Sequence, residues 1–315
     1  MLSDRVTPDG PDLPGVRDAS APKGMDEIRP TLPDRGAWQQ TLALLRYLSQ
    51  TEVHTYAFSV AANTILSLFP FIVLLLTLSR RLFHSVRTEL VVSELMKSFL
   101  PAGQDFVMRN MESLAHPRKG TQIFSLVMLL VTSTGVFLPL EVALNSVWGV
   151  KVNRSYLHNQ AVSLLLAFAV GALAMSSAVL TAGHDVVLGW VFFGHTDNIL
   201  YRLLAYAFLK VCAVVSGVLL FFLIYWVLPH RRVPMRAVLP TAVVVGLLWE
   251  VAKYGYILAL PLLDFRSVYG PFYISVSLMM WAFLSGLLLL AGAHFSATRH
   301  TLRLAREAEK EAAKP

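Results

Sequence analysis

Hydrophobic residues in this chain are gathered into six long runs, which alternate with shorter polar stretches. Each run has about 20 residues or more, and an α-helix needs that length to cross roughly 30 Å of hydrocarbon. Six helices of this kind cannot all be buried in one soluble core of this size. The pattern therefore predicts an all-α, polytopic membrane protein. Its six transmembrane helices are expected at residues 56–78, 123–147, 161–180, 203–228, 238–263 and 272–295.

Two further segments have apolar residues at helical spacing on an otherwise polar background. In residues 38–56 these positions are Trp38, Leu42, Leu45 and Leu48. This segment is expected to form an amphipathic helix, either lying in the membrane interface or packed on the bundle. Residues 87–117 show a similar pattern, which predicts one or two interfacial helices interrupted at Pro101.

The two ends of the chain differ from its apolar centre. Residues 1–35 contain six prolines, scattered charges and few apolar residues. This composition predicts a disordered tail, and the segment lacks the apolar stretch and small-residue cleavage site of a signal peptide. The last residues, 299–315, are polar and predict a solvated helix that continues from the final span. The transmembrane domain is thus expected to occupy residues 36–298.

The composition agrees with a membrane protein, since 55% of the residues are hydrophobic and 15% are charged. Soluble domains average about 45–50% apolar and about 25% charged residues. The net charge of +7 would suit a nucleic-acid-binding protein, but the basic residues lie mainly in the connections between spans. We therefore expect a lipid bilayer around the protein and no nucleic-acid partner.

The basic residues also predict an orientation. The connections at 151–154 and 231–236 and the C-terminal tail are basic, whereas the alternate short connections contain only Arg202 and Arg266. Basic short connections stay in the cytoplasm, so both termini are expected there. The long connection after the first span is also basic and conflicts with this orientation, although long connections count less in the rule.

Two charged residues interrupt the fifth run. Glu250 is near its midpoint, where an ionised side chain costs at least about 2.5–3.5 kcal/mol. Lys253 follows three residues later, within reach on the same helical face. The pair has three interpretations: it clamps this helix to a neighbour, it lines a cavity or a proton path, or the span is displaced and the side chains extend to the interface. The first two interpretations place the pair inside the bundle.

Other polar residues are candidates for the same site. Prolines in three spans, Pro70, Pro139 and Pro240, remove backbone donors and are expected to break their helices. Proline-broken helices with polar side chains are typical of midplane sites in transporters. The candidate residues for a substrate or ion path are Asn63, Ser67, Glu141, Asn145, Lys210, Glu250 and Lys253. Lys210 is expected either to extend toward the interface or to pair with a carboxylate such as Glu250.

One predicted external connection contains two His-Asp pairs, His184 with Asp185 and His195 with Asp197. Such groups can bind a divalent metal, but their separation is not a recognised ligand spacing. The alternative is an ordinary solvated connection, and no metal or cofactor is predicted. The single cysteine, Cys212, lies within the fourth run, which excludes an intrachain disulfide.

Three stretches of the chain resemble the YihY or virulence factor BrkB family, formerly labelled ribonuclease BN. They are "AANTILSLFPFIVLLL" (61–76), "LPLEVALNSVWGV" (138–150) and the block from "IYWVLPHRRV" (224–233) to "VYGPFYISVSLMMWAFLSGLLLLAGAHFSA" (268–297). The resemblance covers roughly residues 38–298. It implies a six-helix protein of the bacterial inner membrane whose substrate is not established, with transport as the common suggestion.

The chain departs from the family pattern at two places. Ala62 and Asn63 stand where the family usually has aromatic residues, just before its Leu-Ser-x-x-Pro motif. His294 stands where the last span of the family usually ends in Gly-Ala-Glu. Any role of that family glutamate is therefore not carried over to this chain.

These features lead to three functional hypotheses. The first is a transporter or permease-like protein for a small solute, an ion or a lipid, with a polar site between proline-broken helices. The second is a non-catalytic membrane scaffold or envelope-integrity protein, in which polar groups hold helices together and amphipathic helices recruit partners. The third is a nuclease, which normally needs a metal cluster or a paired acid and base in a water-accessible site. We prefer the first, expect no enzymatic activity, and regard a homo-oligomer as compatible with it.

Overall fold

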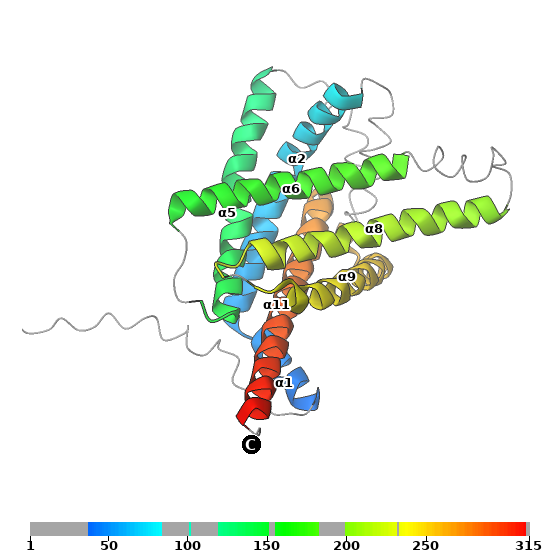
Figure 1. The fold of residues 1–315 in the computed structure, drawn as a ribbon. Helices are drawn as coiled ribbons and strands as arrows, with labels where there is room; N and C mark the ends of the chain where they lie inside the picture. Colours follow the sequence, from blue (N-terminus) through cyan, green and yellow to red (C-terminus); the bar gives the residue numbers. More distant parts are fainter. Residues whose placement is uncertain are drawn as a thin grey trace, which may run out of the picture.

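The computed structural model describes residues 37–83, 101, 119–150, 155–182, 199–231 and 233–312. These residues form α1 (Ala37–Leu48), α2 (Thr51–Phe83), α5 (Lys119–Val147), α6 (Tyr156–Ala182), α8 (Ile199–Val227), α9 (Met235–Leu263), α10 (Phe265–Tyr269), the 3-10 helix η1 (Gly270–Phe272) and α11 (Tyr273–Ala312) (Figure 1). Every regular element in the described part of the chain is helical. The predictions for residues 1–35, for 87–117 apart from Pro101, and for the two His-Asp pairs fall outside it.

Six of the described helices are long and apolar enough to cross a membrane: α2, α5, α6, α8, α9 and α11. An apolar helix suits a bilayer because it satisfies its backbone hydrogen bonds internally. The prediction of an all-α, polytopic membrane protein with six spans is confirmed. α9 ends at Leu263, and the left-handed backbone of the next residue, Asp264 (φ 37°), turns the chain toward α10, η1 and then α11.

The spans form two groups that cross. α2 packs along α5 and α11, and α8 packs along α9 and α6. In Figure 1, α2 and α5 stand upright while α6 and α8 run across them. Both groups contribute to the buried core, which includes Phe137 of α5, Phe221 and Tyr225 of α8, Trp249 of α9 and Trp281 of α11.

Two glycines allow the helices to approach closely in this core. A Cβ added at Gly246 of α9 would come within 2.7 Å of the Val218 side chain on α8. A Cβ added at Gly292 of α11 would overlap both Tyr225 and Val245. Helices in a membrane associate through such close packing, because lipid is as apolar as the side chains. The contacts of α9 with α8 and α11 therefore depend on these two residues lacking a side chain.

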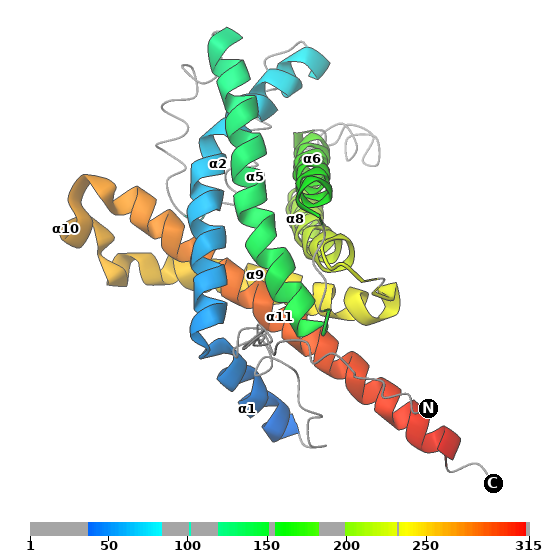
Figure 2. The same ribbon diagram turned by 90° about the vertical axis from the view of Figure 1, so that its left-hand side faces the viewer.

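Prolines lie inside the continuous helices α2, α5 and α9. They are Pro70 in α2, Pro139 in α5, and Pro240 and Pro261 in α9. The expectation that the first three break their helices is corrected, because each helix continues through its proline. A proline removes one backbone hydrogen bond, but in a transmembrane helix the neighbouring turns and packed helices hold the backbone together. Figure 2 shows α2 changing direction along its length without ending.

The N-terminal amphipathic helix is shorter than predicted. α1 ends at Leu48, and residues 51–56 already belong to α2. Side chains stabilise this end, because the Ser49 hydroxyl donates to the Arg46 carbonyl (2.8 Å) and the His54 ring lies 2.7 Å from the Leu48 carbonyl oxygen. The last carbonyl groups of a helix have no partner within it, so such contacts favour a stop at this position.

One face of α1 packs on the bundle and another is exposed. Tyr47 is 4% exposed, and its ring stacks on that of His294 in α11 with 4.4 Å between centroids. Burial raises the pKa of the Tyr47 hydroxyl above its usual value, so this group stays neutral. Trp38, Leu42 and Leu45 are exposed. The packed alternative is therefore observed for one face, while the place of the exposed apolar face in a membrane interface stays a prediction.

Candidate functional site

A cluster of charges joins α8 to α9. Glu250 and Lys253 lie one turn apart on one face of α9, and the Lys253 ammonium group donates to Glu250 Oε1 at 2.8 Å. Lys210 of α8 donates to the other carboxylate oxygen, Oε2, at 3.4 Å. We call Lys210, Glu250 and Lys253 the ion cluster. One carboxylate thus bridges two spans.

The three members of the ion cluster differ in exposure. The side chains of Glu250 and Lys253 are 8% and 5% exposed, whereas that of Lys210 is 34% exposed. An ionised side chain at the bilayer centre costs at least about 2.5–3.5 kcal/mol, and pairing lowers this cost. The structure therefore places Glu250 and Lys253 inside the bundle and pairs Lys210 with Glu250.

Aromatic rings complete the surroundings of the ion cluster. The Lys210 ammonium group donates to the Tyr254 hydroxyl and lies 4.1 Å from the centre of that ring. The Lys253 ammonium group lies 5.1 Å from the Trp249 ring centre. Cations are attracted to the faces of aromatic rings, most strongly to tryptophan. Sequence reasoning missed Tyr254, although its place one turn after Glu250 on the same helix was a usable signal.

Trp249, which lies beside the ion cluster, also belongs to an aromatic core. Its indole N–H donates to the Ser285 hydroxyl of α11 at 3.0 Å. Its ring centre lies 5.6 Å from that of Trp281, which in turn lies 5.4 Å from that of Tyr256. The Tyr256 hydroxyl donates to the Ser277 carbonyl oxygen at 2.7 Å. Buried Trp and Tyr side chains usually find such polar partners. These contacts fix Trp249 between α9 and α11.

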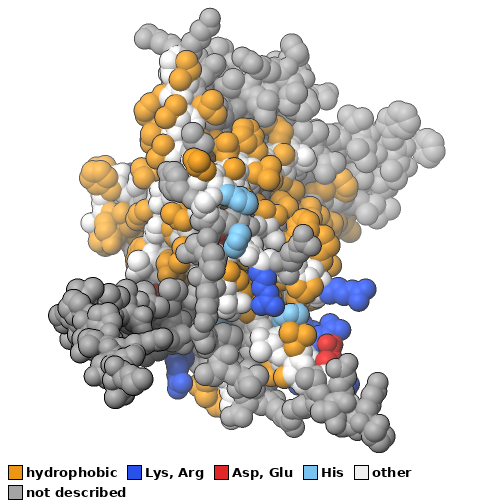
Figure 3. All heavy atoms as spheres, turned by 60° about the vertical axis from the view of Figure 1, so that its left-hand side comes forward, with side chains coloured by type: hydrophobic (Ala, Val, Ile, Leu, Met, Phe, Trp, Pro, Cys, Tyr) orange, Lys and Arg blue, Asp and Glu red, His pale blue; other side chains and the backbone are white. Residues whose placement is uncertain are grey.

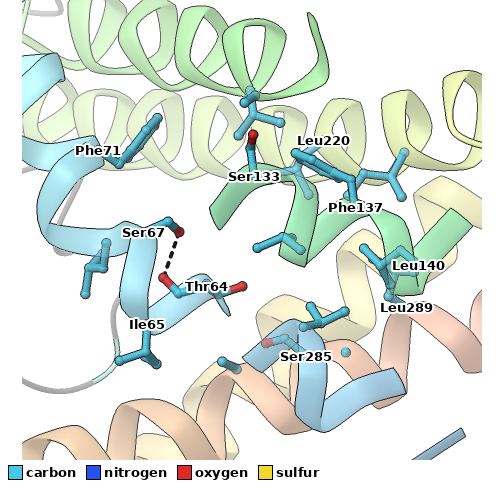
Figure 4. A pocket seen from close by; sticks show the side chains of 18 of the residues that line it. Thr64, Ile65, Ser67, Phe71, Ser133, Phe137, Leu140, Leu220, Ser285 and Leu289 are labelled. Carbon is cyan, nitrogen blue, oxygen red and sulfur yellow. Dashed lines mark hydrogen bonds between the residues drawn. The ribbon is translucent and has the colours of Figure 1, made fainter. Parts of the chain in front are cut away.

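A cavity of about 340 Å³ lies between the six spans. All of α2, α5, α6, α8, α9 and α11 contribute to its wall, which is mostly apolar. Thr64, Ser67, Ser133 and Ser285 bring hydroxyl groups to it (Figure 4). The Ser67 hydroxyl donates to the Thr64 carbonyl oxygen at 2.9 Å, so its own helix holds it in place. Pockets for small molecules typically measure about 300–1,000 Å³ and have apolar walls with a few polar groups, as this cavity does.

Trp249 belongs both to the cavity wall and to the surroundings of the ion cluster. It lines the cavity, and Lys253 lies beside its ring. On α8, Gly217 lines the cavity and lies seven residues beyond Lys210, which is two helical turns or about 10 Å along the same face. Trp249 therefore connects the cavity wall to the ion cluster.

Three other predicted residues lie elsewhere in the bundle. Asn63 of α2 packs against α5 at Gly135, where an added Cβ would overlap the Asn63 amide group. Asn145 is 1% exposed near the end of α5, and its Oδ1 accepts a hydrogen bond from the backbone N–H of His230 at 2.8 Å. Glu141, one turn before Asn145, is equally buried. These residues join α2 to α5 and α5 to the α8–α9 connection, so the predicted residues occupy several places and not one convergent site.

No metal centre is formed by the part of the chain that the structure describes, since it contains no group of three His, Cys, Asp or Glu side chains placed to hold an ion. The ion cluster itself has one carboxylate between two ammonium groups, which repel an added cation. The chemistry open to it is the exchange of protons or the attraction of an anionic group.

Known proteins related to this chain are membrane proteins. The sequence model of the family described as virulence factor BrkB matches residues 44–315. A UPF0761 membrane protein of Cronobacter sakazakii (strain ATCC BAA-894) is 26% identical over 272 residues, which cover 84% of this chain and 90% of that protein. A UPF0761 membrane protein of Yersinia pestis (strain Pestoides F) is 24% identical over 214 residues, or 68% of this chain and 71% of that protein. No solved structure matches. Because the match extends over nearly all of the six-span fold, the chain belongs to the virulence factor BrkB family.

Proposed function

We propose that this multi-pass membrane protein is a permease-like transporter that takes a small solute into the cavity between its six spans. The observation that carries the proposal is a cavity of about 340 Å³ whose wall includes Trp249, the residue that lies beside Lys253 of the ion cluster. Transporters commonly place substrate and coupling-ion sites near the bilayer midplane, between facing helices. The proposal includes no catalytic step, no cofactor and no nucleic-acid partner.

The lining of the cavity favours a solute that is largely apolar. A strongly hydrated ion would lose its water there and find few polar groups to replace it. The Ser285 hydroxyl, which accepts the hydrogen bond from Trp249, can still donate one to a polar end of the solute. The solute class is therefore a small apolar or amphipathic molecule, and lipids belong to that class.

The ion cluster supports a role in coupling to protons. Glu250 lies between two ammonium groups, at 2.8 and 3.4 Å, so the gain or loss of one proton changes the charge of a buried site. That change weakens or strengthens the attraction between α8 and α9, both of which line the cavity. A proton can shift a conformational equilibrium in this way when it binds one state more tightly than the other.

The proposal places the protein in the bacterial inner membrane with both termini in the cytoplasm. Arg231 contacts the end of α5 at Trp148, whose ring lies 5.8 Å from that of His300 in α11. Basic residues therefore gather at the end of the bundle where α11 leaves it. Arg266 lies in the connection from α9 to α11, at the opposite end of α9. Under the positive-inside rule the more basic end is cytoplasmic.

A membrane scaffold is the second candidate, and one observation favours it. The carboxylate of Glu250 binds a lysine on each of two spans, which is the geometry of a clamp between helices. In this alternative the ion cluster serves folding alone, and no solute crosses the membrane through the cavity.

Transport can be tested with a variant whose larger side chain occupies the cavity without disturbing the packing of the helices. Gly217 lines the cavity, and a Cβ added there would meet nothing within 4 Å, so Gly217→Leu is expected to extend into empty space. Gly255 is exposed on α9 and equally unobstructed, so Gly255→Leu is the matched control. Each change raises helix propensity by roughly 1 kcal/mol, so both variants should fold.

Uptake into proteoliposomes is then measured for a panel of apolar, amphipathic and ionic solutes, with and without a pH gradient. We expect uptake by the parent and by Gly255→Leu, and a loss of at least about tenfold in Gly217→Leu, because leucine occupies the volume that the solute needs. Uptake by Gly217→Leu at the parental rate would contradict the cavity as the path. A parent that moves no member of the panel would favour the scaffold.

A further inference from the structure

A second cluster of polar side chains lies outside the cavity, where α5 ends, α6 begins and α8 connects to α9. We call His158, His230, Arg231, His300 and Arg303 the basic patch. The rings of His158 and His230 are 6.5 Å apart, and Arg231 is linked to His300 through Trp148, which contacts both. Figure 3 shows histidine and basic side chains gathered along one face of the molecule.

The connection that carries the centre of the basic patch is held in place by buried groups. The His230 backbone N–H donates to Oδ1 of Asn145, which is 1% exposed, at 2.8 Å. The Arg231 guanidinium group donates from Nη1 to the Trp148 carbonyl oxygen at 3.4 Å. The side chains of His230 and Arg231 remain exposed. The backbone is thus held in place while the Arg231 guanidinium group and the His230 ring remain exposed, which lowers the entropy cost of binding a ligand.

The electrostatics of the basic patch favour an anion. α6 begins at Tyr156, so the positive end of its dipole lies beside His158. Arg303 is partly neutralised by Glu307, whose Oε1 accepts a hydrogen bond from its Nε at 3.1 Å. Arg231 has no acidic partner among the described residues, and it is therefore the principal cation of the patch. A guanidinium group can bind two oxygens of one phosphate.

Exposed apolar side chains lie next to the basic patch. Leu157, next to His158, is 79% exposed, and Trp226 and Met235 are exposed on either side of the α8–α9 connection. Tryptophan is enriched at the boundary between hydrocarbon and headgroups. A soluble anion would gain nothing from this apolar surface, whereas the acyl chains of a lipid would cover it.

We propose that the basic patch binds the phosphate headgroup of an anionic phospholipid, with Arg231 as its main contact and the acyl chains lying against Leu157. Lys and Arg side chains near a membrane surface attract anionic headgroups, and each contributes about a fivefold change in affinity. This site is distinct from the cavity and does not depend on the transport proposal.

The test compares lipid binding to the purified full chain by native mass spectrometry, with phosphatidylglycerol and with phosphatidylcholine. Arg231→Gln is expected to weaken phosphatidylglycerol binding about fivefold and to leave phosphatidylcholine binding unchanged. The matched control, Arg266→Gln, removes the same charge from an exposed position on the other connection and should change neither. Equal losses in the two variants, or none in either, would overturn the proposal.

Two further measurements separate a lipid from a free anion and from a folding defect. Leu157→Ser should also weaken phosphatidylglycerol binding, because it removes apolar contact beside the patch without changing charge. Millimolar inorganic phosphate should displace little bound lipid. Complete displacement, together with no effect of Leu157→Ser, would identify a site for free phosphate and refute the lipid. Equal melting temperatures of the variants and the parent establish that the losses are not due to misfolding.

Discussion

Removing the charge of Glu250 tests whether the ion cluster holds the bundle together, moves protons, or does both. Glu250→Gln keeps the shape of the side chain but takes away the negative charge that lies between Lys210 and Lys253. A second variant, Glu250→Gln combined with Lys253→Met, also removes the more deeply buried ammonium group. The two variants differ in whether a buried positive charge remains.

The magnitude follows from the distances. At an effective dielectric constant of about 20, unit charges at the 2.8 Å separation of Glu250 and Lys253 attract by roughly 6 kcal/mol. Desolvation offsets part of this, and breaking a buried pair costs about 3–5 kcal/mol in soluble proteins, with smaller values in membranes. Lys210 adds less, because its side chain is 34% exposed and is screened by solvent. We expect Glu250→Gln to cost about 3 kcal/mol, which lowers Tm by roughly 6–12 °C.

The assay pairs the Tm of the detergent-solubilised protein with uptake into proteoliposomes at several pH values. The double variant should regain most of the lost Tm, because replacing a buried ion pair by apolar groups is often neutral. Neither variant should show pH-dependent uptake, since the glutamine amide does not exchange a proton as a carboxylate does. Glu307→Gln, which changes an exposed acid on α11, is the control and should shift stability by less than about 0.5 kcal/mol.

Two results would refute parts of this reasoning. If Glu250→Gln has the same Tm as the parent, the ion cluster does not stabilise the packing of α8 on α9. If the double variant regains both its stability and pH-dependent uptake, Glu250 is not the proton carrier, and the ion cluster is a clamp of the kind a scaffold needs.

Three further predictions concern the packing and the orientation. Tyr47→Ala should lower the free energy of unfolding by about 3–5 kcal/mol, because a large ring that is 4% exposed is lost. Limited proteolysis should then cut between α1 and α2. Resistance to the protease would contradict the packing of α1 on the bundle. Gly246→Val should lower Tm through overpacking against α8 that costs about 1–3 kcal/mol, and an unchanged Tm would show that the helices can separate. In a Cys212→Ser background, a cysteine-reactive dye added outside cells should label Ser267→Cys and spare Arg236→Cys; the reverse pattern would invert the orientation.

The six spans could be predicted from the sequence because length and hydropathy are local properties of each helix. The contact between Glu250 and Lys253 is equally local, since residues three apart share a helix face. The pairing of Lys210 with Glu250, 40 residues apart, could be raised as one alternative but not decided, because it depends on how α8 packs on α9. The helices also continue through prolines that were expected to break them, since surrounding packing outweighs one lost hydrogen bond.

A site between spans could be raised from the sequence, but the lining of the cavity could not be predicted beyond Ser67. Its wall takes residues from all six spans, with only Trp249 coming from α9, and most of them are ordinary apolar side chains that look the same in a filled core. Whether they enclose empty space depends on the angles at which the two groups of helices cross, which no single helix encodes. The position of Tyr254 one turn after Glu250 was a signal for its place near the ion cluster, but its contact with Lys210 depends on how α8 packs on α9.

The length of α11 has a mechanical consequence. The helix has 40 residues and is about 60 Å long at 1.5 Å per residue, roughly twice the thickness of the hydrocarbon layer. Its first half carries Trp281 and Ser285 in the cavity wall, residues 293–298 are still packed in the bundle, and only the part beyond Thr298 projects past the other spans in Figure 2. A tilt of about 5° imposed at the cavity would move a point roughly 30 Å farther along by about 2.6 Å. Any tilt of α11 around the cavity would therefore produce a larger displacement at the far end of the helix.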